Sequence, residues 1–217
     1  MLYLVTGVNG VGKSIFIKEL INEREDFSHI QGSSELMKRL GIENGNYEKL
    51  RNFDEKIKND IFERIIFEAS EKYHDNLSGH AIVDGHVLNM ICGKVVRAMS
   101  NNTLKLFSSV IYLHAETNEI IGRLEKDNSG RDRAIFEKKS ESVNERQTLD
   151  DYQKQFEEIL EKECLQNNIL FYKILHLENR TCDSILIFSK IHEKILEDNL
   201  TEQSSEIRLG LNEMRRR

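Results

Sequence analysis

The feature that most constrains this chain is the segment from Gly7 to Ser14, which reads GVNGVGKS and satisfies the pattern GxxxxGK[ST]. An apolar, β-branched segment, Leu2 to Thr6, precedes it, and a segment with helical spacing follows it. A glycine-rich turn between a strand and a helix lets backbone N–H groups surround a phosphate, and the helix N-terminus adds positive potential. The motif in this context predicts a P-loop that binds a nucleoside triphosphate with Mg²⁺, rather than a plain glycine-rich turn.

Two side chains of the loop have expected roles of their own. Lys13 is expected to reach the outer phosphates, and the Ser14 hydroxyl to ligate Mg²⁺. The expected cofactors are therefore ATP and Mg²⁺. The nucleotide contacts expected in and beside the loop are Gly7, Asn9, Gly10, Val11, Gly12, Lys13, Ser14 and Ile15.

Apolar strands alternate with helices along the rest of the chain. After Leu2 to Thr6, strands are expected at 27–31, 80–85, 109–114 and 169–177. Helices are expected from 14, from 33 or 34, and at 47–73, 87–99, 117–124, 136–163 and 183–196. This alternation implies right-handed βαβ units and an α/β fold, a three-layer sandwich with about five parallel strands flanked by helices.

The bulk composition limits the class of partner and the compartment. The formal net charge of -6 favours a small anionic ligand over a surface built for nucleic acid. No apolar run is long enough to span a membrane, so we expect a cytoplasmic protein. The three cysteines and the histidines show no metal-ligand spacing, so we expect reduced, buried thiols and ordinary histidines.

Asp84 closes the apolar strand expected at 80–85. If this strand lies beside the first one in a parallel sheet, the carboxylate faces the same crevice as the P-loop. Asp84 is then a second candidate for holding Mg²⁺, directly or through water; capping of the next helix is the alternative. His86, two residues further on, is expected to be structural or to contact a substrate.

Several arginines outside the P-loop are candidates for phosphate contacts. Arg131 and Arg133 lie in a loop rich in small and charged residues, where mobile cations could close over a triphosphate; a solvated charged loop is the alternative. Arg123, on the preceding helix, could equally be a surface salt-bridge residue. The same doubt applies to Arg51 and Arg146.

These residues resemble the P-loop nucleoside-monophosphate kinases, and among them the archaeal-type adenylate kinases. The markers, in order, are GVNGVGKS, IVDGH at 82–86, the pair Arg131-Asp132, and LENR at 177–180. The likeness covers about residues 1–196. It implies a kinase domain at 1–197 with an acceptor-binding insertion at about 32–75 and a lid at about 127–137, followed by a polar, possibly disordered tail at 198–217.

The resemblance also implies roles for single residues. Lys13 and the lid arginines Arg131 and Arg133 would stabilise the transferred phosphoryl group, Asp84 would organise Mg²⁺, and Arg51 would grip the acceptor phosphate. Arg146 would face the same site from a helix, Arg180 would lie near the adenine, and Gly32 and Ser33 would open the helix beside the acceptor nucleoside. Arg123 is a further candidate nucleotide contact that the resemblance does not assign. Asn9 and Gly85 depart from the proline and the threonine usual in the family, which leaves the acceptor in doubt.

The function expected first is transfer of the γ-phosphate of ATP to a nucleoside monophosphate. One alternative is a P-loop ATPase or nucleotide-dependent switch acting on a protein partner, although Gly85 and His86 stand where such an enzyme has a glutamate. Another is a kinase of a nucleoside or a polynucleotide 5′-hydroxyl. For that last class, the candidate phosphate contacts are Lys94, Arg97, Lys105 and the terminal arginines 215–217.

Overall fold

The structure is a computed structural model that describes residues 1–73, 79–91, 94–126, 145–176 and 181–214. Its centre is a sheet of five strands in the order β2-β3-β1-β6-β7. The strands are β1 (Leu2–Thr6), β2 (Phe27–Gln31), β3 (His80–Asp84), β6 (Ser109–His114) and β7 (Leu170–Leu175), and every neighbouring pair is parallel. The predicted α/β class and the parallel sheet are confirmed.

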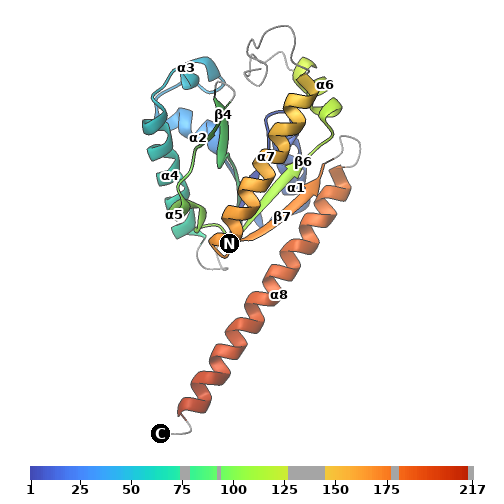
Figure 1. The fold of residues 1–217 in the computed structure, drawn as a ribbon. Coiled ribbons are helices and arrows are strands. Elements are labelled where there is room, and N and C mark those ends of the chain that lie inside the picture. Colours follow the sequence, from blue (N-terminus) through green and yellow to red (C-terminus); the bar gives the residue numbers. More distant parts are fainter. Residues whose placement is uncertain (74–78, 92–93, 127–144, 177–180, 215–217) are drawn as a thin grey trace.

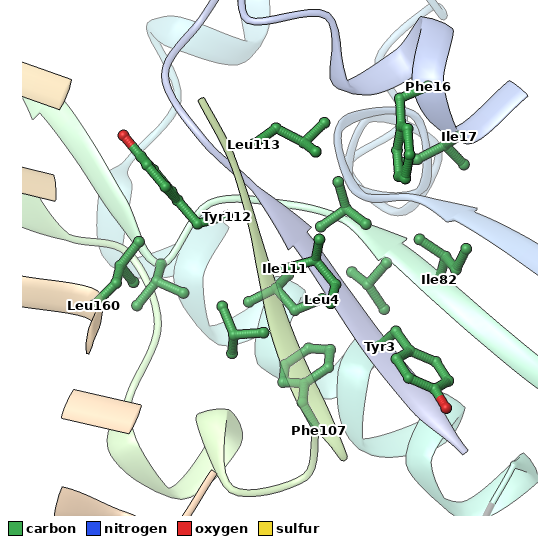
Figure 2. Packing of buried hydrophobic residues seen from close by; sticks show 14 of the residues in the cluster. Tyr3, Leu4, Phe16, Ile17, Ile82, Phe107, Ile111, Tyr112, Leu113 and Leu160 are labelled. Atoms are coloured by element: carbon green, nitrogen blue, oxygen red, sulfur yellow. The ribbon is translucent and has the colours of Figure 1, made fainter. Parts of the chain in front are cut away.

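Helices cover both faces of this sheet, as Figure 1 shows. They are α1 (Lys13–Glu23), α2 (Gly32–Arg39), α3 (Tyr47–Arg51), α4 (Glu55–Lys72), α5 (Asn101–Leu104), α6 (Thr117–Lys126), α7 (Glu145–Gln166) and α8 (Thr181–Met214). In Figure 2, Tyr112 of β6 lies on the same side of the sheet as Leu160 of α7, whereas Phe16 of α1 lies on the other side. The Tyr112 hydroxyl donates to the backbone oxygen of Gln153 in α7 at 3.0 Å. Three layers therefore pack around one apolar core.

A hairpin replaces the helix predicted at 87–99. Strands β4 (Leu88–Ile91) and β5 (Lys94–Arg97) pair antiparallel, and the amide of Ala98 extends the pairing by donating to the oxygen of Val87 at 2.8 Å. The helix prediction was wrong because Val95 and Val96 favour extended backbone.

The single helix predicted at 47–73 is divided into α3 and α4. Side-chain caps mark both starts: Asn46 accepts from the amide of Lys49 at 3.0 Å, and Asp54 accepts from that of Ile57 at 3.0 Å. Such caps satisfy amides that have no partner in the first turn of a helix. The amphipathic pattern was interpreted correctly as helical, but the cap at Asp54 starts a second helix.

The last helix is longer than predicted. Helix α8 continues past 196 to Met214, and in Figure 1 its C-terminal half extends away from the sheet. The boundary expected between 197 and 198 therefore falls inside a helix. Residues 198–214 contain no proline, and their one glycine, Gly210, lies within α8. The functional division into a kinase domain and a tail stays a prediction. The part of the predicted helix from 136 to 144 lies outside the described residues.

Two cysteines differ in their surroundings. Cys164 of α7 is buried, whereas Cys182 of α8 is exposed, so the expectation of buried thiols is wrong for Cys182. Burial, helped by the neighbouring charge of Glu163, raises the pKa of the Cys164 thiol to about 12. The thiolate is the nucleophilic form, so Cys164 should be unreactive in the folded protein.

This contrast gives a test of the packing of α7. In the variant Cys92→Ser, a chromogenic disulfide reagent should modify one thiol of the native protein and two after unfolding in urea. Adding Cys182→Ser should remove the native reaction and leave the reaction in urea. Rapid modification of Cys164 under native conditions would mean that α7 is not packed as the structure has it.

Candidate functional site

The P-loop joins the end of β1 to the start of α1, as the motif predicts. Gly10 and Gly12 have φ of +83° and +102°, values that favour glycine. A Cβ on Gly10 would lie 2.9 Å from Cγ of Leu124, and one on Gly12 would lie 2.7 Å from the ring of His176. The loop is therefore shaped by glycines that touch α6 and the end of β7.

Lys13 lies over the loop rather than in solvent. Its Nζ donates to the backbone oxygens of Gly7 at 3.0 Å and Val8 at 3.3 Å, and the side chain is buried. These bonds hold a positive charge inside the curve of the loop, where an anion bound to the backbone amides would meet it.

Asp84 and Ser14 lie together at the edge of the sheet. Strand β3 is the parallel neighbour of β1, with Val5 opposite Asp84, which confirms the arrangement expected from the sequence. Ser14 Oγ donates to Oδ2 of Asp84 at 3.2 Å. Two ligands adjacent on an octahedral Mg²⁺ lie about 2.9 Å apart, so this hydroxyl and carboxylate fit such an ion.

A small pocket opens to solvent beside the loop, with a cavity volume of about 20 Å³. It lies between the P-loop, the residues after β3, the hairpin and α7. The residues that line it are Val8, Asn9, His86, Leu88, Asn89, Tyr152 and Phe156. Burial, and secondly the charge of Lys13, lowers the pKa of His86 to about 3. The lining contributed by the described residues is therefore uncharged at neutral pH.

Residues 6–141, more than half of the chain, match the model of a family described as an AAA domain, AAA_17. The chain belongs to this family. No curated protein matches the sequence of this AAA domain.

Solved structures support the fold of the AAA domain. Shikimate kinase from Bacteroides thetaiotaomicron superposes with a TM-score of 0.55 at 16% identity, covering 89% of this chain and 98% of that one. The enzyme from Acinetobacter baumannii, in complex with shikimate, gives 0.55 at 17%, covering 92% and 94%. The enzyme from Aquifex aeolicus gives 0.52 at 14%, covering 90% and 99%. At such identities the likeness shows the fold alone, that of P-loop kinases, and the closer resemblance to archaeal-type adenylate kinases stays a prediction.

Arg123 of the AAA domain is tied to the P-loop. One nitrogen, Nη1, donates to the backbone oxygen of Val11 at 2.7 Å and that of Gly10 at 3.4 Å, while Nη2 pairs with Glu119 at 3.1 Å. The salt-bridge interpretation is thus correct, and the same side chain also holds the loop. Direct contact of Arg123 with a nucleotide stays a prediction.

His176, which the sequence did not point to, packs against the P-loop from the side of β7. His176, at the end of β7, is buried with its ring against Gly12, and its Nδ1 lies 3.4 Å from the hydroxyl of Ser184. Tyr152 and Phe156 of the pocket were missed as well. The spacing of four residues between Tyr152 and Phe156 could have indicated that both lie on one face of a helix. No local sequence pattern indicates the contact of His176 with the loop, because that contact depends on the order of the strands.

The other predicted residues are placed as follows. Ile15 is 52% exposed at the start of α1. Gly32 begins α2 against the end of β3, since a Cβ there would lie 2.6 Å from the backbone oxygen of Asp84. Arg51 is exposed at the end of α3 and is not a lining residue of the pocket. The sites outside the described residues are Arg131, Arg133 and Arg180, and the side chain of Arg146 is also outside them.

The structure bears on two remaining interpretations. Arg97, a candidate nucleic-acid contact, is engaged within the protein: it pairs with Glu163 and donates to the oxygen of Met99 and the side chain of Asn101. Of the helices in the described part of the chain, none has the length and apolar content to cross a membrane.

Proposed function

We propose that this AAA domain transfers the γ-phosphate of ATP to a nucleoside monophosphate, in the manner of the adenylate kinases. The observation that carries the proposal is the arrangement at the end of the sheet: Lys13 inside the P-loop, the Ser14–Asp84 pair at its rim, and a pocket lined in part by Val8 and Asn9 of the loop. The proposed phosphate site and the proposed acceptor site would then be adjacent.

On the nucleotide side, Ser14 and Asp84 would hold Mg²⁺, and the fit of their oxygens supports this. Such an ion bridges phosphate oxygens and neutralises part of their charge. Lys13 would move from the carbonyls of the loop to the outer phosphates. Phosphoryl transfer asks mainly for positioning and electrostatic stabilisation, so a site without a protein nucleophile is sufficient.

On the acceptor side, the pocket supports a planar, uncharged group. Tyr152 and Phe156 offer aromatic surface, and the amides of Asn9 and Asn89 can both donate and accept hydrogen bonds. A nucleobase that approaches from the solvent side and widens this small pocket would meet both aromatic surface and amide groups. We further propose that α2 to α4 form the acceptor-binding region, with Arg51 as its contact to the acceptor phosphate.

A second candidate acceptor is a small hydroxy acid such as shikimate. The shikimate kinases share the fold over nine-tenths of this chain, which favours it. The lining of the pocket favours a base over such an acid through its aromatic and amide groups; among the described residues, the lining has no lysine or arginine for either a carboxylate or an acceptor phosphate. A P-loop ATPase is less favoured still, since His86 and Gly85 follow Asp84 where a catalytic glutamate would be needed.

An acceptor panel tests the proposal. The protein is incubated with ATP and Mg²⁺ and, in turn, with each nucleoside monophosphate, a nucleoside, shikimate and a 5′-hydroxyl oligonucleotide, and phosphorylated products are measured. We expect a nucleoside diphosphate as the product. Tyr152→Ala should then raise the KM for the acceptor about tenfold with little change in the KM for ATP.

Leu165→Ala is the matched control, because Leu165 lies on the same helix and is 77% exposed. It should leave both KM values unchanged. Phosphorylation of shikimate and of no monophosphate would replace the proposal by the second candidate. If ATP were hydrolysed to inorganic phosphate and no acceptor of the panel were phosphorylated, the kinase proposal would be wrong.

A further inference from the structure

A cluster of possible metal ligands lies at the opposite edge of the sheet from the P-loop. Asp26 immediately precedes β2, His80 begins β3, and His192 comes from α8. In a parallel sheet the amino ends of all strands share one edge, and the P-loop follows the carboxyl end of β1. The cluster is therefore separate from the nucleotide site, and an inference about it does not depend on phosphoryl transfer.

The geometry of the three side chains is close to that of a bound ion. One ligand atom from each lies within 4.8 Å of the other two. Two ligands on a tetrahedral zinc ion lie about 3.3 Å apart, so small side-chain rotations would close the cluster. The side chain of Asp26 is 43% exposed, which gives an entry path, while His192 is 1% exposed.

One ring nitrogen of His192, Nε2, faces the cluster. The other, Nδ1, lies 2.7 Å from the Tyr3 hydroxyl, in a hydrogen bond for which either group can be the donor. The tautomer in which Nδ1–H donates to the Tyr3 oxygen leaves the lone pair on Nε2, and a metal ion bound at Nε2 would select this tautomer. Among the described residues Nε2 has no hydrogen-bond partner, although it is buried, and it lies 4.0 Å from Oδ2 of Asp26.

A buried ring nitrogen that has no hydrogen-bond partner beside a carboxylate oxygen costs free energy, and a cation bound between the two atoms would remove that cost. Metal binding needs the neutral imidazole, so an ion here would be held by the unprotonated Nε2 of His192.

Two positive groups already face this cluster. Arg24 donates to both oxygens of Asp26 at 2.9 Å, and the amino group of Met1 lies 3.4 Å from Nδ1 of His80 while bonded to backbone oxygens. An ionised carboxylate has about four acceptor positions, so Arg24 leaves some of them open and fixes the orientation of the group. The positive charges lower the affinity for a cation without blocking the site.

We propose that Asp26, His80 and His192 form a zinc-binding site. Two imidazole nitrogens and one carboxylate oxygen are a donor set that zinc takes in proteins, with water as the fourth ligand. Its ligands come from three elements far apart in the sequence, so no local spacing reveals it. Zinc would tie α8 to the amino ends of β2 and β3, and it would stabilise the folded protein.

The test is zinc binding to the full chain, with Mg²⁺ in excess to occupy the site at Ser14 and Asp84. Calorimetry should find one zinc ion per chain, zinc should raise Tm, and cobalt should give the visible absorption of a tetrahedral site. Asp26→Asn should weaken zinc binding by about tenfold or more and abolish the Tm increase. His80→Gln should do the same.

Arg24→Gln is the matched control, since it breaks the same ion pair as Asp26→Asn but keeps all three ligands. It should bind zinc as tightly as the natural chain, or more tightly. The proposal is overturned if the natural chain binds no zinc, if Asp26→Asn binds it unchanged, or if Arg24→Gln loses it to the same extent as Asp26→Asn.

Discussion

Lys13→Met is expected to reduce phosphoryl transfer by about a thousandfold while leaving the fold intact. The substitution keeps the aliphatic stem but removes the charge that lies against Gly7 and Val8. Positioned cations at a transferring phosphoryl group contribute on this scale, because they act where charge develops in a site that excludes water. The measurement is kcat/KM for ATP with a saturating acceptor.

Lys18→Met is the matched control, because Lys18 is an exposed lysine of the same helix. Its kcat/KM and the urea midpoint of unfolding should equal those of the natural chain. If Lys13→Met kept near-normal kcat/KM, the loop would not be the phosphate site.

Asp84→Asn is expected to reduce kcat by about a hundredfold and to raise the Mg²⁺ concentration needed for half-maximal activity. The amide can still accept from Ser14, so the bond at 3.2 Å can persist, but the negative charge that attracts the ion is lost. Activity should therefore be measured across a Mg²⁺ titration at constant ATP.

The control for Asp84→Asn is Asp60→Asn, because Asp60 is an exposed carboxylate residue of α4. It should leave the Mg²⁺ titration unchanged. If Asp84→Asn titrated as the natural chain does, Asp84 would serve only as a partner of Ser14, and the metal assignment would be wrong.

The sheet could be predicted from the sequence because its strands are short, apolar and bounded by polar or glycine-rich turns. The bounds of β1, β2 and β6 match those expected. The hairpin at β4 and β5 could not be separated from a helix by apolar spacing alone, since four-residue strands are too short to show a period. The polar composition of residues 198–214 predicts a tail, and for that reason the sequence did not indicate the full length of α8.

Within the candidate site, the predictable residues were those whose partners follow from a local motif or from strand adjacency. Lys13 and Ser14 belong to the motif, and Asp84 ends the strand beside β1. Tyr152 and His176 could not be placed in this way. Their approach to the loop depends on how α7 and β7 pack, which is a contact between segments more than a hundred residues apart.

The same limit applies to the histidines. The sequence predicts ordinary histidines, because no pair of them has the spacing of metal ligands within one element. Folding brings His80 and His192 together, with ring centroids 4.6 Å apart, and adds Asp26. A site assembled from three elements becomes visible only when the order of the strands is known.

The fold shared with the shikimate kinases does not identify the acceptor of this chain. One fold hosts several chemistries, so the acceptor must be argued from the side chains that line the pocket. Here Tyr152 and Phe156 supply aromatic surface and the asparagines supply amide groups. These residues, and not the likeness of the fold, favour a nucleotide.

The most direct test of phosphoryl transfer follows the γ-phosphate of labelled ATP in the presence of Mg²⁺ and a mixture of nucleoside monophosphates. The structure and the proposed roles of Lys13, Ser14 and Asp84 predict that the label appears in a nucleoside diphosphate, and that release as inorganic phosphate is slower by about a hundredfold or more. Label found only in inorganic phosphate, at the same rate with and without the acceptors, would contradict the account.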